Sequence, residues 1–390
     1  MRILTALVFP LLLLGRPVHA ADESVNLRYF RDLAETRSYS LGRPVSPQPT
    51  PDGTAVIFLR GGPRDRVLRL YEFDLATGRE RELITPAQLL GGAEETLSAE
   101  EKARRERSRN SLRGFTEFDL SPDGSRVLLT LSGKLYVVNR AGREVTALPG
   151  QNWIAPRFSP DGAFVAAAHG GELHVIDLAT GTARALTTGA SATLTHGHAD
   201  FIAQEEMDRF EGFWWSPDSR WLAYQETDES PVESRYIADP LYPESLPQKF
   251  AYPRAGTANA RVRLGIISRE GGPTRWVVWD AEKFPYLARA IWRESGAPLT
   301  ILVQDRRQQD QRLLAVDSAT GATRELLRET DPAWLNLPAV SLPRWLKGAK
   351  QFIWATERRG FWQLEQRDAN GALVRELTPV DLGYRSLLHV

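Results

Sequence analysis

The stretch that decides the fold is Ser-Pro-Asp-Gly at residues 121–124, which is followed by the apolar run 127–129. The same phrase recurs, each time before an apolar run, at 50–53, 159–162 and 216–219, where Thr replaces the first Ser in one copy and Ser replaces the Gly in another. In such a phrase proline presets φ for a turn, aspartate caps the turn with its carboxylate, and glycine tolerates positive φ. We therefore predict four tight turns, each of which starts a β-strand.

A second phrase follows the first at a near-constant distance. It reads Leu-Tyr-Glu-Phe-Asp-Leu-Ala-Thr-Gly at 70–78 and Leu-His-Val-Ile-Asp-Leu-Ala-Thr-Gly at 173–181, with a shorter copy at 135–142. Weaker copies end at Gly272, Gly321 and Gly371. A turn, two strands, a hairpin and a closing strand make a four-stranded blade of about 40–45 residues, the β-propeller unit. The sequence predicts an all-β fold, a β-propeller with six such blades and short helical insertions.

The spacing of the turns locates the insertions. Successive turn aspartates are separated by 71, 38 and 57 residues, and only the middle step fits a bare blade. The first insertion, near 86–114, contains Ser-Ala-Glu-Glu at 98–101, a capping pattern that predicts a highly charged helix. Acidic and basic residues alternate along this helix, which favours a solvated surface helix over a basic binding patch. The second insertion runs from about 196 to 213.

The first twenty residues are typical of a secretory leader. A basic residue at Arg2, an apolar run at 3–14 and small residues before the cleavage point predict removal after Ala20. The alternative is a buried N-terminal strand, because the run is too short to span a bilayer as a helix. We expect an exported chain, periplasmic or secreted, with an N-terminal segment at 21–44 and the propeller at 45–390.

Composition excludes several function classes. The 49 basic residues balance the 49 acidic ones, which argues against a nucleic-acid binder that depends on phosphate neutralisation. The absence of cysteine excludes disulfides, thiolate metal sites and a cysteine nucleophile. His196 and His198 form a His-x-His pattern, but two histidines without a third ligand do not predict a metal site. We expect neither a metal nor a cofactor.

The second insertion carries the candidate binding residues, Glu205 and Glu206, on a short helical segment. Consecutive helical side chains point about 100° apart, and two carboxylates at a helix end can both pair with one ammonium group. Glu-Glu pairs also occur at 94–95 and 100–101. The pattern alone therefore leaves two interpretations open, a binding site and an ordinary solvated pair.

A family resemblance favours the binding site. The run Glu-Glu-Met-Asp-Arg at 205–209, with Gly-Phe-Trp-Trp-Ser-Pro-Asp at 212–218, resembles the dipeptidyl peptidase IV family of the prolyl oligopeptidase superfamily. Other stretches that resemble its bacterial members are 89–93, 97–107, 227–232 and 252–259. The resemblance implies a propeller of which about six of eight blades are present. It also implies that Glu205 and Glu206 hold the N-terminal ammonium of a peptide from which Xaa-Pro or Xaa-Ala dipeptides are released.

Two features of the family pattern are missing. Family members continue into a C-terminal α/β-hydrolase domain with its serine in a Gly-x-Ser-x-Gly elbow; residues 1–390 contain no such pattern, and no histidine stands in a triad context. We therefore expect no catalytic residue and no peptidase activity in this chain alone. The resemblance fades after Thr378, so we expect a truncated, frameshifted or split coding sequence. The animal enzymes also use an arginine from the second blade, which the hairpin at 129–136 lacks.

The sequence thus predicts the N-terminal, amine-anchoring propeller of an exported dipeptidyl peptidase IV-like serine exopeptidase. Its expected partners are peptides with a free N-terminus, an α/β-hydrolase domain in a longer or separate product, and a second copy of the chain. Nucleic acid and a membrane span are not expected. The alternative is a stand-alone periplasmic propeller that binds peptides or acts as a scaffold, and a scaffold has no need for the glutamate pair.

Overall fold

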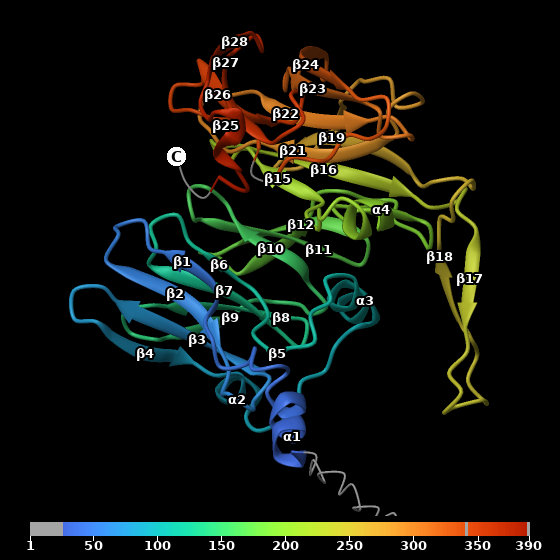
Figure 1. Ribbon diagram of the computed structural model, residues 1–390. Helices are drawn as coiled ribbons and strands as arrows, with labels where there is room; N and C mark the ends of the chain where they lie inside the picture. The colour runs from blue at the N-terminus through green and yellow to red at the C-terminus, as the bar shows by residue number, and fades with distance from the viewer. Residues whose placement is uncertain (1–25, 340–341, 388–390) are drawn as a thin grey trace, which may run out of the picture.

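The structure, a computed structural model, describes residues 26–339 and 342–387. The predicted leader at 1–20 lies outside the described residues. The described chain forms six consecutive antiparallel sheets that follow one another in sequence order (Figure 1), together with short helices and one separate hairpin. The predicted all-β propeller architecture, with blades of four strands, is therefore confirmed.

The first three sheets lie between residues 45 and 185. The first contains β1 (Val45–Pro49), β2 (Ala55–Arg60), β3 (Val67–Asp74) and β4 (Arg79–Ile84), and β5 (Arg113–Gly114) pairs in parallel with β3. The second contains β6 (Phe118–Leu120), β7 (Arg126–Leu131), β8 (Lys134–Asn139) and β9 (Val145–Ala147). The third contains β10 (Ile154–Phe158), β11 (Phe164–His169), β12 (Glu172–Asp177) and β13 (Thr182–Ala185).

The last three sheets follow the same plan. The fourth contains β14 (Leu194–His196), β15 (Phe213–Trp215), β16 (Trp221–Asp228), β19 (Arg261–Ser268) and β20 (Arg275–Trp276). The fifth contains β21 (Tyr286–Ile291), β22 (Leu299–Gln304), β23 (Asp310–Val316) and β24 (Thr323–Thr330). The sixth contains β25 (Arg344–Trp345), β26 (Gln351–Thr356), β27 (Gln363–Asp368) and β28 (Leu373–Glu376).

The predicted turn chemistry is present at each Pro-Asp phrase. Ser121 donates its hydroxyl to the Asp123 carboxylate at 2.6 Å, and that carboxylate also accepts the backbone N–H of Ser125 at 3.0 Å. These hydrogen bonds, with the one from Ser121 first, lower the pKa of Asp123 to about 2. The fourth residue of the phrase has positive φ in every copy, at 66°, 71° and 69° in the glycines and 61° in Ser219. Each turn thus directs the chain into the next strand, as predicted.

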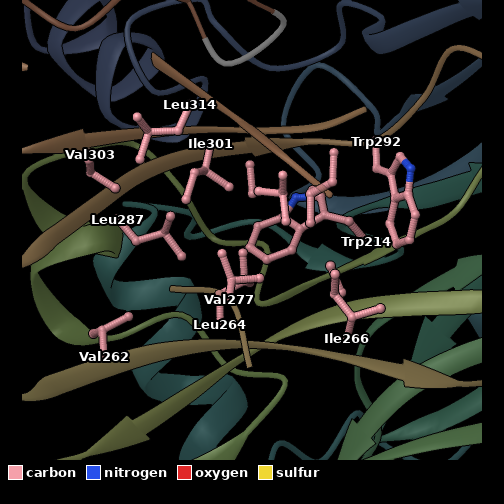
Figure 2. Close-up of a cluster of buried hydrophobic side chains, with 14 of the residues drawn as sticks. Trp214, Val262, Leu264, Ile266, Val277, Leu287, Trp292, Ile301, Val303 and Leu314 are labelled. Carbon is pink, nitrogen blue, oxygen red and sulfur yellow. The ribbon is translucent and has the colours of Figure 1, made fainter. Parts of the chain in front are cut away.

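The core lies between neighbouring sheets rather than at one centre. In the largest cluster, Leu264 and Ile266 of the fourth sheet pack against Leu287, Ile301 and Val303 of the fifth (Figure 2). Further buried clusters join the first sheet to the second, the second to the third, the third to the fourth and the fifth to the sixth. Strands that are covered on both faces are rich in apolar residues. In β22 every residue is buried, and four of the six are Leu, Ile or Val.

The ring of sheets is not closed. Each sheet uses strands that are close in sequence, and within the described residues no strand of the first sheet pairs with a strand of the sixth. Figure 1 shows the first sheet (blue) and the sixth (red) at opposite ends of the stack.

Helices and one hairpin extend from this stack. They are α1 (Leu27–Glu35), α2 (Pro86–Leu90), α3 (Ala99–Arg107), α4 (Phe201–Glu205), η1 (Val380–Leu382) and the hairpin of β17 (Ser234–Ile237) and β18 (Gln248–Ala251). Within the described part of the chain, no helix has both the length and the apolar character that crossing a bilayer requires.

The prediction that the charged helix of the first insertion is simply solvated is wrong for one side of α3. Ser98 caps the helix as expected, by accepting the N–H of Glu101 at 3.1 Å. Glu101 and Arg105, however, are buried and pair with each other at 2.8 Å, and Arg105 pairs with Glu95 at 2.8 Å. Mutual neutralisation lets these charges leave water. Two further side chains of α3 reach other parts of the chain: Arg104 pairs with Glu117, and Arg107 donates to Gln204 of α4.

Candidate functional site

The candidate site is the glutamate arm, residues 197–212, which connects β14 to β15. Asp200 caps the start of α4 by accepting the N–H of Ala203 at 3.3 Å. The helix ends at Glu205, and Glu206 is its C-cap, with its N–H donated to the carbonyl of Ile202 at 2.9 Å. The two predicted glutamates therefore stand together at the C-terminal end of a short helix.

Both glutamate side chains are exposed. Neither carboxylate makes an ion pair or a side-chain hydrogen bond with any residue that the structure describes. The carbonyl groups at a helix C-terminus carry partial negative charge, and they favour a cation there. Two unpaired carboxylates at this position suit a ligand with a positive charge.

Two residues that follow the glutamates, Met207 and Arg209, are buried. Met207 lies in the apolar cluster between the fifth and sixth sheets, and Arg209 is 4% exposed. Arg107 of α3 donates to the side chain of Gln204 at 3.2 Å, and its guanidinium lies 5.2 Å from the centre of the Phe201 ring. The arm thus contacts the first insertion through α4, and it contacts the fifth and sixth sheets through Met207.

A cavity of about 330 Å³ adjoins the base of the arm. Asp208, Phe210 and Glu211 of the arm form part of its wall, with Arg104, Arg157 and Arg293 among the residues opposite. Charges of both signs meet here, since Arg104 pairs with Glu117 at 2.8 Å. Glu205 and Glu206 do not line the cavity.

The two histidines have structural partners. His196 is buried, with Nδ1 2.8 Å from the Glu172 carboxylate and Nε2 3.2 Å from that of Glu226, so it joins the third sheet to the fourth. His198 lies with Nδ1 3.1 Å from the His196 carbonyl, and burial lowers its pKa. Among the described residues, no group of three or more His, Asp or Glu side chains is arranged to hold a metal ion.

The residues that sequence reasoning missed are the arginines beneath the arm, Arg209 and Arg289. A signal was present: the strand β21 reads Tyr-Leu-Ala-Arg-Ala-Ile, with an arginine inside an apolar run. A buried arginine in such a run must find acceptors, and here it binds backbone carbonyls of the arm and its neighbours.

The six blades of residues 45–376 and the glutamate arm define a class, the β-propellers that carry a polar insertion in one blade. A comparison with family models matches residues 121–390 to the dipeptidyl peptidase IV N-terminal region. The chain belongs to this family through that region, and the predicted resemblance is confirmed.

Individual relatives agree with this placement. Mouse dipeptidyl peptidase 8 is 25% identical over an alignment of 334 residues that covers 68% of this chain and 37% of that protein. Mouse inactive dipeptidyl peptidase 10 is 26% identical over an alignment of 170 residues that covers 41% of this chain and 21% of that protein. The crystal structure of Porphyromonas gingivalis dipeptidyl peptidase 4 shares the fold, with a TM-score of 0.70 and 21% identity over 90% of this chain and 48% of that one. The chain spans less than half of each of these relatives.

Proposed function

We propose that this propeller binds the free N-terminal ammonium of a peptide through Glu205 and Glu206. The observation that carries the proposal is the pair of exposed carboxylates, which have no ion-pair or hydrogen-bond partner among the described residues and are followed by buried residues. An ammonium ion has three donors and no acceptor, so it can satisfy both carboxylates at once. A fixed amine sets which peptide bond reaches a nucleophile, as an enzyme that counts residues from the N-terminus requires.

Binding of valyl-proline and of its N-acetyl form by isothermal titration tests the proposal. Hydrogen bonds between charged groups contribute about 1.5–3 kcal/mol, so the free amine should bind roughly tenfold to hundredfold more tightly than the acetylated peptide. In Glu205→Gln/Glu206→Gln this preference should disappear. The matched control, Glu94→Gln/Glu100→Gln, changes exposed glutamates of the other two Glu-Glu pairs and should keep it.

Equal affinity of the wild-type chain for the two peptides would contradict the amine-binding role. Peptide binding without an amine preference would instead favour the alternative, a stand-alone propeller that binds peptides or acts as a scaffold.

We also propose that a longer or separate product supplies the Ser-Asp-His triad and that the complete enzyme releases Xaa-Pro or Xaa-Ala dipeptides. The family supports this proposal, and the lack of a Gly-x-Ser-x-Gly pattern within residues 1–390 supports inactivity of this chain alone. Purified chain should not release a chromophore from an Xaa-Pro substrate. Release that a serine-directed inhibitor abolishes would refute the proposed inactivity.

Export and self-association complete the proposal. The leader pattern at 1–20 supports export with cleavage after Ala20, which N-terminal sequencing of the secreted protein checks. The β17–β18 hairpin supports a homodimer, because it projects from the stack (Figure 1) and leaves Leu241 81% and Leu246 94% exposed. Leu241→Asp/Leu246→Asp should convert a dimer to a monomer in sedimentation. A wild-type chain that sediments as a monomer would rule out this role of the hairpin.

A further inference from the structure

We propose that Arg209 and Arg289 are positioning residues that set the place of Glu205 and Glu206 by clamping the chain immediately after them to the fifth sheet. The inference rests on the proposed amine-binding function. Both arginines are buried, at 4% and 5% exposure, and both line the cavity next to the arm. Neither makes a hydrogen bond or an ion pair with the side chain of Glu205 or Glu206 among the described residues.

Arg289 holds the chain next to the glutamates. It lies in β21, and its Nη1 donates to the backbone carbonyl of Met207, the residue after Glu206, at 2.7 Å. Its Nε and Nη2 donate to the carbonyl of Pro338 at 3.3 and 2.9 Å. One guanidinium therefore connects the arm, the fifth sheet and the chain that leads to the sixth.

Arg209 holds the arm from the other direction. Its Nη2 donates to the backbone carbonyl of Leu287 at 2.9 Å and to the side-chain oxygen of Gln225 at 2.7 Å. Gln225 in turn donates to the carboxylate of Asp200 at 2.9 Å, the N-cap of α4. Arg209, which follows the C-terminal end of α4, is thus bound to Leu287 of β21 and to Gln225 of β16. Through Gln225 it is also connected to the N-cap of α4.

An irregularity in β21 leaves two backbone carbonyl groups available to accept hydrogen bonds from the arginines. The register of β21 against β22 shifts between Leu287 and Arg289, and β21 is the edge strand of its sheet. A bulge of this kind disrupts the ladder and turns a side chain. The Leu287 carbonyl accepts from Arg209, and the Ala288 carbonyl accepts from Arg289 at 2.8 Å, while the Arg289 side chain reaches the arm.

The two guanidiniums lie close enough to repel each other. Burial lowers the pKa of Arg289 to about 10, and the charge of Arg209 adds to that effect. Burial also lowers the pKa of Arg209, and its nearest carboxylate, that of Asp200, is 3.6 Å away. Replacement of buried charged groups by apolar residues of similar volume is often neutral or stabilising, so stability alone does not account for two neighbouring buried arginines. What the pair provides is a rigid fork with fixed directions, which suits the placement of a binding loop.

Arg209→Lys and Arg289→Lys test the inference in the full chain. Lysine keeps the charge but lacks the fork, so the arm should remain near its sheet with looser placement. We expect the affinity for valyl-proline to fall roughly tenfold while that for N-acetyl-valyl-proline stays unchanged, since a small displacement of a positioned group is costly. The matched control is Arg367→Lys in β27, which is 4% exposed and binds the Glu365 carboxylate at 2.6 Å. It should lower the thermal midpoint without changing the amine preference.

Hydrogen exchange separates failure of this inference from failure of the proposed function. The N–H groups of Glu206 and Arg209 bind the carbonyls of Ile202 and Ala203 at 2.9 Å each. Both should exchange faster in the Arg209→Lys and Arg289→Lys variants than in Arg367→Lys. If the wild type has no amine preference, the proposed function is wrong. The exchange rates of these two N–H groups then still test whether Arg209 and Arg289 hold the arm in place. If the Arg209→Lys and Arg289→Lys variants keep the amine preference and their exchange rates are unchanged, the positioning role of the arginines is wrong and the proposed function is not affected.

Discussion

Replacing Glu329 with leucine should destabilise the contact between the fifth and sixth sheets. Glu329 lies in β24, is 5% exposed and accepts three buried donors. These are Gln311 Nε2 at 2.7 Å, Trp354 Nε1 at 3.2 Å and Thr356 Oγ1 at 2.6 Å, of which the last two come from the sixth sheet.

The magnitude follows from those donors. Leucine leaves the amide, indole and hydroxyl groups without an acceptor, and each unsatisfied buried group costs about 1–3 kcal/mol. Burial of the leucine side chain returns about 1.5–3 kcal/mol, and the Thr356 hydroxyl can turn toward another acceptor. Arg358, which also binds Glu329 at 3.2 Å, is 43% exposed and returns to water at little cost. We expect a net loss of about 3 kcal/mol in the free energy of unfolding.

Urea unfolding followed by tryptophan fluorescence measures this loss. Glu325→Leu is the matched control, because Glu325 lies on the same strand but is 41% exposed and pairs with Arg312. Removal of an exposed pair changes stability by less than about 1 kcal/mol. If the Glu329 and Glu325 variants unfold with equal free energies, the buried carboxylate does not join the sheets in the way described.

Two further predictions concern a turn and the arm. In Asp123→Asn, the loss of stability relative to the wild type should be larger at about pH 6 than at about pH 3. A carboxylate whose folded pKa is lowered stabilises the fold above its unfolded pKa of 3.8, and it loses that contribution as the pH falls toward about 2. Chemical denaturation at both pH values checks this, and an equal loss at both would contradict it. In Gly212→Ala, the new methyl group would lie 2.4 Å from the backbone oxygen of Gly197, so we expect a loss of about 1–3 kcal/mol and a weaker amine preference. Calorimetry and peptide titration measure the two effects, and an unchanged variant would refute the close approach.

The blades could be predicted from the sequence because their signals are local. The carboxylate of Asp123 binds groups only two residues away in either direction, at Ser121 and Ser125. The helix that carries Glu205 and Glu206 was predicted in the same way, from a short run of neighbouring residues.

The base of the arm could not be predicted, because its contacts join distant residues. Arg209 binds the carbonyl of Leu287, 78 positions away, and Arg289 binds that of Met207, 82 positions away. The wrong expectation for α3 has a similar cause, since Arg105 is neutralised partly by Glu95 from the preceding loop. Charge alternation along a helix does not reveal which charges find partners when the helix packs.

The location of the apolar clusters between successive sheets has a consequence for how the chain acquires its structure. Each sheet is complete within a short span of sequence and needs only the sheet before it as a packing surface, so blades can be added one at a time as the polypeptide leaves the ribosome. In such an array each blade is stabilised mainly by its contacts with the neighbouring blades. The free energy of local unfolding should therefore differ from one blade to the next. The second to fifth sheets, each of which packs against a neighbouring sheet on both faces, should then keep their amide protection longer than the first and the sixth.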